Sequence, residues 1–210
     1  MVRASRTDAA KAWENGSISE NLRKYVEAVY LLDAVTRRVP SDAWHNQSCC
    51  TAWTARQVAG HAAWYVKTIG SLAAGAGPIA PEDEAEVLGD NPASTMRSIA
   101  RATFAQLDQP GALARVVPTP AGEMPLDVWI GALRVDPLIH AWDLVDATGI
   151  PHGIDAESAT DAHAAMQPWI EVLPASGGHG DGAAAKGEDP VAKFIAFTGR
   201  TTVSWGRRGC

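Results

Sequence analysis

The sequence predicts one all-α domain built around a bundle of four long helices. In four segments, apolar residues recur at spacings of three and four, which is the pattern of helices that bury one face. Residues typical of helix ends flank these segments, with polar capping residues or proline before them and proline or glycine after them. Hydrophobic residues make up 46% of the chain, which is enough to build a core without indicating a membrane protein.

The chain length of 210 residues suits a single domain, and no internal repeat divides it. Residues 1–16 carry charged groups but no apolar segment, so they do not resemble a secretory signal and we expect a flexible leader. We expect residues 17–210 to form the domain, with the glycine-rich segment 174–190 as a mobile loop within it. These features predict a cytoplasmic protein.

Each long helix has a predicted start and stop. The first opens at Ser17-Ile18-Ser19-Glu20, which has the spacing of a capping box, and continues up to Pro40. The other three have these end signals: Thr54 to the glycines at 75–77, Asn91-Pro92 to Pro110, and about Pro125 to Ala147 with Gly149 as the stop. Four helices of this length, joined by connections of mixed length, are typical of a helical bundle.

The remaining segments predict short elements and loops. Residues 112–120 contain a β-like run that we expect to be a strand edge or an extended connector. A fifth helix is predicted over residues 156–172, with Asp155 as its cap, and a short last helix over residues 191–197. The fold class is therefore an all-α four-helix bundle with additional short helices and loops.

The charge balance argues against nucleic acid as a partner. The formal net charge is −6, and much of the acidity lies in residues 81–90, which we expect to form a solvated loop. Nonspecific nucleic-acid binding needs a basic surface, and Arg200, Arg207 and Arg208 form too short a tail to supply one. No apolar run approaches the roughly 18–20 residues of a membrane-spanning helix. We therefore expect neither a nucleic-acid nor a membrane partner.

The cysteines, Cys49, Cys50 and Cys210, do not indicate a disulfide framework. Their number is odd, two of them are adjacent, and none has the spacing of metal ligands. A catalytic Cys50 near a loop is one alternative. We expect all three to be dispensable for the chemistry predicted below.

Two polar residues interrupt the apolar face of the fourth long helix. Between Leu133 and Leu144, Asp136 and His140 occupy positions that should face the core. Burial of a carboxylate is costly unless it is paired or binds a cation. Residues at i and i+4 lie on one helix face with Cβ atoms roughly 5–6 Å apart, so this carboxylate and imidazole can reach one metal ion.

The second long helix shows the same kind of interruption. His61 lies on its apolar stripe between Val58 and Tyr65. Two histidines and one aspartate with open coordination positions suit catalytic zinc. Iron(II), nickel and manganese suit the same ligands, because ligand type alone discriminates poorly between these metals. The sequence therefore predicts His61, Asp136 and His140 as the ligands of a divalent metal.

Each candidate also has a structural interpretation. Asp136 precedes Pro137 and would cap a helix that starts at this proline, although the unbroken stripe upstream favours one helix with a kink. His61 alone would be a hydrogen-bonded core histidine. Asp143 lies three residues after His140, and three roles remain open for it: a fourth ligand, an outer partner of the histidine, or a surface charge.

Several short motifs follow one another along the chain. The sequence CTAWTARQVAGH ends at His61, a later D-x-x-x-H contains Asp136 and His140 and is followed by AWDLVDATG, and FIAFTGR ends at residue 200. The order of these motifs resembles that of the DinB-like superfamily. More narrowly, the chain is similar to the actinobacterial group related to the metal-binding domain of mycothiol-dependent maleylpyruvate isomerase. The resemblance covers roughly residues 18–200.

This resemblance implies a four-helix bundle that holds a divalent metal, commonly zinc, through three side chains. Those positions match His61, Asp136 and His140. The isomerase has glutamate where this chain has Asp136, and the shorter side chain could change the position and affinity of the metal. Known members include thiol-dependent transferases and isomerases that use mycothiol or bacillithiol, and other members act in natural-product pathways.

We therefore expect a divalent-metal-dependent enzyme of the thiol transferase or isomerase type, acting on a small-molecule substrate. The metal would lower the pKa of a bound thiol, such as mycothiol, as it does for bound water. One alternative is an enzyme of secondary metabolism that uses the bundle pocket with or without metal. Another is a non-catalytic subunit that supports a partner enzyme. A homodimer is compatible with each, and the sequence assigns no catalytic residue beyond the metal ligands.

Overall fold

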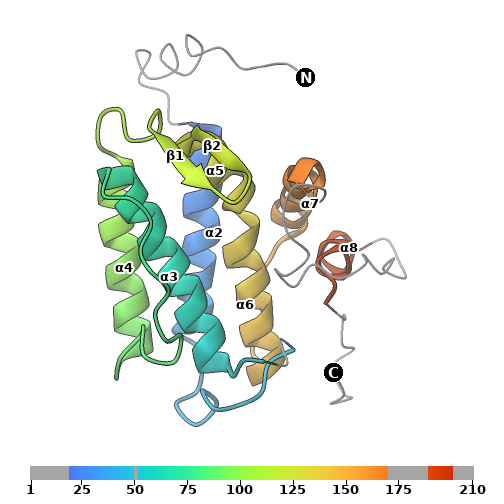
Figure 1. Cartoon of the computed structure of the whole chain (residues 1–210). Coiled ribbons are helices and arrows are strands. Elements are labelled where there is room, and N and C mark those ends of the chain that lie inside the picture. The colour runs from blue at the N-terminus through green and yellow to red at the C-terminus, as the bar shows by residue number, and fades with distance from the viewer. Residues whose placement is uncertain (1–18, 50–51, 170–188, 201–210) are drawn as a thin grey trace.

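A computed structural model describes residues 19–49, 52–169 and 189–200. In this part of the chain the protein is mainly helical, with one two-stranded sheet, as the sequence predicts (Figure 1). No helix among these residues is both long enough and apolar enough to cross a membrane. The predicted leader, 1–16, and nearly all of the glycine-rich segment 174–190 lie outside the described residues.

Four long helices pack side by side: α2 (Glu20–Thr36), α3 (Ala55–Ala74), α4 (Pro92–Leu107) and α6 (Val135–Thr148) (Figure 1). Both α2 and α3 pack against α4 and against α6, so each of the four helices has two neighbours. Their apolar stripes meet in the interior, where these side chains are almost fully buried: Val29, Leu32, Val58, Ile69 and Leu144. Burial of these stripes holds the helices together, because each apolar side chain removed from water contributes roughly 1.5–3 kcal/mol.

The ends of α3 and the start of α4 follow their sequence signals. Thr54 and Gln57 form a reciprocal capping box at the start of α3, and Gly75 ends the helix in a left-handed conformation with φ of 79°. Asn91 caps α4 by accepting a hydrogen bond from the Ser94 backbone N–H at 3.1 Å. The capping box of Thr54 and Gln57 fixes the start of the helix that carries His61.

The first long helix begins later and ends earlier than its sequence signals predict. The N-cap of α2 is Ser19 rather than Ser17, and its hydroxyl accepts a hydrogen bond from the Leu22 backbone N–H at 3.4 Å. The helix ends at Thr36, ahead of Pro40. Pro40 has no N–H to donate to the carbonyl of Thr36, and its ring clashes with this carbonyl, so the helix cannot continue through the proline.

The predicted fourth helix is in fact two helices, α5 (Leu126–Leu133) and α6, with a break at Arg134. Pro137 has no N–H to donate to the carbonyl of Leu133, so the helix cannot continue unchanged through this point. In the first turn of α6 the missing N–H removes no intrahelical hydrogen bond. Because α6 already starts at Val135, the interpretation of Asp136 as the cap of a helix starting at Pro137 is wrong.

The predicted β-like run, residues 112–120, contains one strand of a β-hairpin. Antiparallel β1 (Val116–Thr119) and β2 (Gly122–Pro125) pair with Val116 opposite Pro125. Gly122 has φ of 101° at the tight turn, a conformation that side chains disfavour. The sequence predicted the first strand but not its partner.

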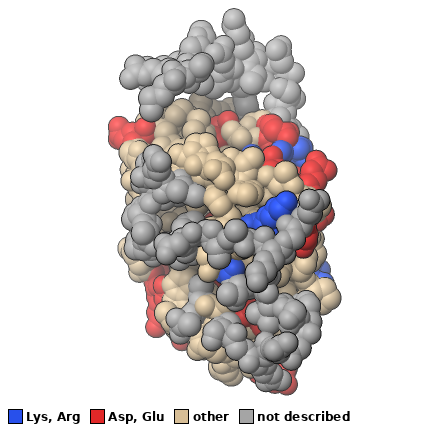
Figure 2. All heavy atoms as spheres, turned by 90° about the vertical axis from the view of Figure 1, so that its right-hand side faces the viewer, with Lys and Arg blue, Asp and Glu red and all other residues tan. Residues whose placement is uncertain are grey.

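A second layer covers the outer side of α6. It consists of α7 (Ala156–Met166), which Asp155 caps, the 3₁₀ turn η1 (Gln167–Trp169) and α8 (Pro190–Phe197) (Figure 1). The α7 helix ends before the predicted residue 172, and the chain tightens into η1. On the described part of this face, basic side chains are scattered among acidic and uncharged ones (Figure 2).

The segment that joins α3 to α4, residues 76–91, lies along α3. Three side chains of α3 hold it by donating hydrogen bonds: Arg56 to the Ala85 carbonyl at 2.7 Å, Trp64 to the Ala80 carbonyl at 3.0 Å, and Lys67 to the Glu82 carboxylate at 2.6 Å. Leu88 is fully buried, although several acidic side chains of the segment are exposed. The prediction of a solvated loop is therefore correct only for those acidic side chains.

Candidate metal centre

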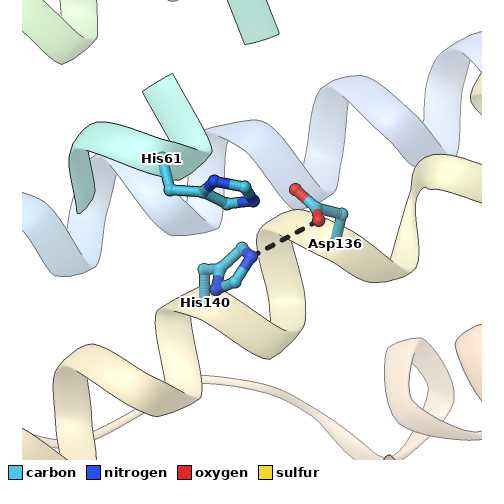
Figure 3. A group of neighbouring side chains, drawn as sticks. All are labelled: His61, Asp136 and His140. Atoms are coloured by element: carbon cyan, nitrogen blue, oxygen red, sulfur yellow. Dashed lines mark ion pairs between the residues drawn. The ribbon is translucent and has the colours of Figure 1, made fainter. Parts of the chain in front are cut away.

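The three predicted ligands converge although they come from two helices. His61 projects from α3, and Asp136 and His140 project from α6 toward the same point (Figure 3). One nitrogen or oxygen atom of each residue lies within 4.8 Å of those of the other two. Since α3 packs directly against α6, a helix–helix contact far apart in sequence assembles the group.

The distances suit a small divalent ion. His140 Nε2 lies 3.4 Å from Asp136 Oδ1, and the rings of His61 and His140 are 5.2 Å apart at an angle of 76°. Zinc binds nitrogen and oxygen at about 2.0–2.2 Å, so two of its tetrahedral ligands are about 3.3 Å apart. The pair on α6 already has this separation, and the group needs only a modest contraction to surround one ion.

Asp136 and His140 form an ion pair in a largely buried setting. Burial alone would lower the pKa of His140, but the carboxylates of Asp136 and Asp143 outweigh this effect and raise the pKa to about 9. Burial would likewise raise the pKa of Asp136, and the charge of His140 reverses the effect and lowers it. A metal ion that binds here takes the place of the imidazole proton.

His61 is held in its neutral form. Burial lowers the pKa of His61, and the attraction of Asp136 offsets this only in part. A neutral imidazole has a free lone pair, which is the form that binds a metal. The site therefore combines one ready donor, His61, with a donor that must first lose a proton, His140.

Asp143 lies behind His140, on the side away from Asp136. His140 Nδ1 is 3.1 Å from Asp143 Oδ2, and the Asp143 side chain is fully buried. The interpretation of Asp143 as a surface charge is therefore wrong. Asp143 is not among the residues whose ligand atoms converge, which are His61, Asp136 and His140. The structure therefore favours Asp143 as an outer partner of His140 rather than as a fourth ligand. A carboxylate in this position accepts a hydrogen bond from the Nδ1–H group, which leaves Nε2 free to bind a metal.

Sequence reasoning missed two partners of Asp143. Arg200 donates from Nε to Oδ1 at 2.6 Å and from Nη2 to Oδ2 at 2.9 Å. The Cys49 thiol donates to Oδ1 at 3.1 Å, and burial together with the Asp143 charge raises the pKa of this thiol far above its ordinary value. Cys49 therefore stays protonated. The motif FIAFTGR contained Arg200, but its basic character alone suggested only a tail.

Three aromatic rings lie close to His61. The ring centroids of Trp53, Tyr65 and Trp64 lie 4.5, 5.4 and 6.0 Å from that of His61. All three side chains are only partly buried, and Trp53 also lies 6.4 Å from His140. This arrangement gives the metal centre an apolar wall that remains accessible.

Gly60, next to His61, lets the segment 76–91 approach the site. A Cβ atom on Gly60 would lie 1.7 Å from the backbone oxygen of Glu84, so no other residue permits this contact. The charge of Glu84 also acts on His61. The segment therefore lies against α3 next to His61 and brings the charge of a further carboxylate near this histidine.

Comparisons with known proteins identify relatives but no activity. Two proteins of Mycobacterium tuberculosis, one from strain CDC 1551 and one from strain H37Rv, are each 29% identical to this chain over 173 residues. The alignment covers 80% of this chain and 91% of each relative, and both relatives are described as uncharacterized proteins. No family model matches the chain. No solved structure matches it either.

Proposed function

We propose that this protein is a divalent-metal-dependent enzyme of the thiol transferase or isomerase type, built on a DinB-like four-helix bundle. The observation that carries the proposal is the convergence of His61, Asp136 and His140 within 4.8 Å, from two helices, in a largely buried setting. Two imidazoles and one carboxylate match the three-ligand sites of catalytic zinc. Iron(II), nickel and manganese are the other metals that suit these ligands.

The surroundings of the three ligands support catalysis rather than a purely structural metal site. Three protein ligands leave a coordination position for an exogenous group, whereas structural zinc sites have four. A metal bound here would act as a Lewis acid toward that group. Trp53, Trp64 and Tyr65 are only partly buried, so they can offer apolar contacts to a substrate beside His61.

Two observations favour a thiol cosubstrate. The motif order resembles that of thiol-dependent members of the DinB-like superfamily. The Cys49 thiol, bound to Asp143 with a strongly raised pKa, does not supply a thiolate itself. We propose that the reacting sulfur comes from a small molecule such as mycothiol, and the two other cysteines, Cys50 and Cys210, lie outside the described residues.

A titration of the cobalt(II)-loaded protein with mycothiol, or with a simpler thiol analogue, tests this proposal. Direct sulfur ligation adds a charge-transfer band in the near ultraviolet and releases about one proton per site. Both signals should vanish in His140→Ala and persist in Cys50→Ser and Cys49→Ser. An unaltered spectrum at saturating thiol would reject a thiol cosubstrate.

The aromatic wall favours a second candidate, an enzyme of secondary metabolism with an apolar or aromatic substrate. Trp53 lies near both histidines, so a flat substrate could stack there beside the metal. Trp53→Ala would then weaken substrate binding and leave metal affinity unchanged. An unaltered cobalt spectrum with thiol, together with such a loss, would favour this candidate.

A further inference from the structure

Arg200 follows α8 in sequence, yet its side chain enters the interior and contacts α6 beside the metal centre. We propose that Arg200 is a positioning residue of the metal site, which acts through Asp143 on His140 and couples the docking of residues 189–200 to metal binding. This inference rests on the proposed function, because it requires that the three ligands bind a metal.

Arg200 forms hydrogen bonds both with Asp143 of α6 and with its own segment at the end of α8. Its guanidinium donates hydrogen bonds to both carboxylate oxygens of Asp143, at 2.6 and 2.9 Å. Arg200 is 9% exposed and Asp143 is 0% exposed. On its own segment, Nη1 donates to the Thr198 carbonyl at 3.2 Å, and the Arg200 backbone N–H donates to the Ile195 carbonyl at 3.3 Å. The side chain is therefore fixed relative to the end of α8.

The α8 helix is itself fixed on the body of the protein. Phe194 and Ile195 are fully buried in a cluster that includes Leu138 and Ile139 of α6. The same α6 helix thus receives the apolar face of α8 and, nearby, the guanidinium of Arg200. Docking of residues 189–200 and placement of Arg200 on Asp143 are therefore one structural event.

The contact continues from Asp143 to the metal ligand. A bidentate arginine fixes the plane of a carboxylate, because two parallel hydrogen bonds leave it little freedom to rotate. In this fixed plane Oδ2 accepts from His140 Nδ1 at 3.1 Å, while Nε2 lies 3.4 Å from Asp136. Arg200 therefore sets the orientation of the imidazole without touching the metal.

The chain contains a matched control for this argument. Arg97 donates to the buried carboxylate of Asp33 at 3.0 Å, so it is also an arginine paired with a buried aspartate. No histidine belongs to the described contacts of that pair. Removal of Arg97 therefore tests the loss of a structural ion pair alone.

The experiment measures zinc affinity by competition with a chromophoric chelator, and the visible spectrum of the cobalt protein, in Arg200→Gln, Arg200→Lys and Arg97→Gln. Loss of an outer-shell partner typically weakens metal binding roughly 10- to 100-fold, and since Arg200 acts through such a partner, Asp143, the lower end of this range applies. We expect a loss of this size and an altered cobalt spectrum in Arg200→Gln, partial recovery in Arg200→Lys, and wild-type affinity in Arg97→Gln.

Coupling is reciprocal, so metal should also stabilise the docked segment. Zinc should slow amide hydrogen exchange in residues 189–200 of the wild-type protein and leave it unchanged in His61→Ala. This measurement decides the inference even if Arg200→Gln does not fold. The inference would be overturned, while the proposed metal site stands, if both Arg200 variants bind zinc with wild-type affinity. It would also be overturned if zinc does not change the rate of amide hydrogen exchange in residues 189–200. Failure of the wild-type protein to bind any metal would overturn both.

Discussion

Asp33 on α2 is buried and Asp136 on α6 is largely buried, with a side chain that is 22% exposed, and different kinds of cation balance these two carboxylates. Asp33 of α2 is 4% exposed and pairs with two arginines, at 3.2 and 3.0 Å. Asp136 of α6 instead lies with two histidines, His61 and His140. Arginine stays protonated, whereas imidazole can lose its proton and offer a lone pair to a metal. A carboxylate in the interior therefore indicates a metal site only where its neighbours can become neutral donors.

The largest expected effect separates these two aspartates directly. Asp136→Asn removes the charged ligand, so zinc affinity should fall by more than about tenfold while far-ultraviolet circular dichroism stays unchanged. Asp33→Asn should leave zinc affinity unchanged and lower the free energy of unfolding by about 1–3 kcal/mol. Isothermal titration and chemical denaturation measure the two quantities. Equal zinc affinity in both variants would remove the distinction between the two regions.

Removal of the metal should lower the stability of every protein that retains the metal site at Asp136. An ion that binds only the folded state contributes about 4 kcal/mol when its free concentration is a thousandfold above Kd. Chelation should therefore lower the Tm of the wild-type and Asp33→Asn proteins but not that of Asp136→Asn. The check is differential scanning calorimetry with and without chelator, and an unchanged wild-type Tm after confirmed metal removal would contradict the prediction.

Gly60→Ala sharpens the comparison because it disturbs only the surroundings of His61. The new methyl group would collide with the backbone of Glu84, and such overpacking typically costs about 1–3 kcal/mol of stability. Gly131→Ala is the control, since its methyl group would meet only the movable side chain of Asn21. Denaturation curves of the two variants should differ by this amount. Equal stability would show that the segment 76–91 is not fixed on α3.

The pH dependence of metal binding should have a defined sign. Below about pH 9 zinc must displace the proton of His140, so affinity should rise by up to about tenfold per pH unit and level off above that value. In the metal-free protein the sign is opposite. The folded-state pKa is raised, so the ion pair stabilises fully below about pH 6.5 and its contribution is lost as the pH rises through about 9. Chelator competition and urea denaturation across this range test both signs.

The helices and the candidate metal ligands could be predicted from the sequence because both depend on local periodicity. The position of His61 on a stripe, and the spacing of Asp136 and His140 on another, follow from helix geometry. Their convergence required α3 to pack against α6, which the stripes favour but do not specify. The position of the break at Arg134 was harder to predict from the sequence, because a proline disrupts a helix several residues before its own position.

The outer partners of the site were not predictable from the sequence in the same way. Cys49 and Arg200 contact Asp143 from a loop and from a segment beyond the last helix. No periodicity relates either residue to α6. Only the packing of α8 on α6 brings Arg200 into place, and tertiary contacts of this kind leave no regular pattern in a sequence.

The most direct test of the account is elemental analysis of the purified protein together with its His61→Ala variant. His61 comes from a different helix than the other two ligands, so its removal tests the convergence itself. The account predicts one divalent ion per wild-type chain, retained through dialysis, and none in the variant. A wild-type protein that holds no ion and does not bind added zinc, iron(II), nickel or manganese would contradict it, as would a variant that retains the ion.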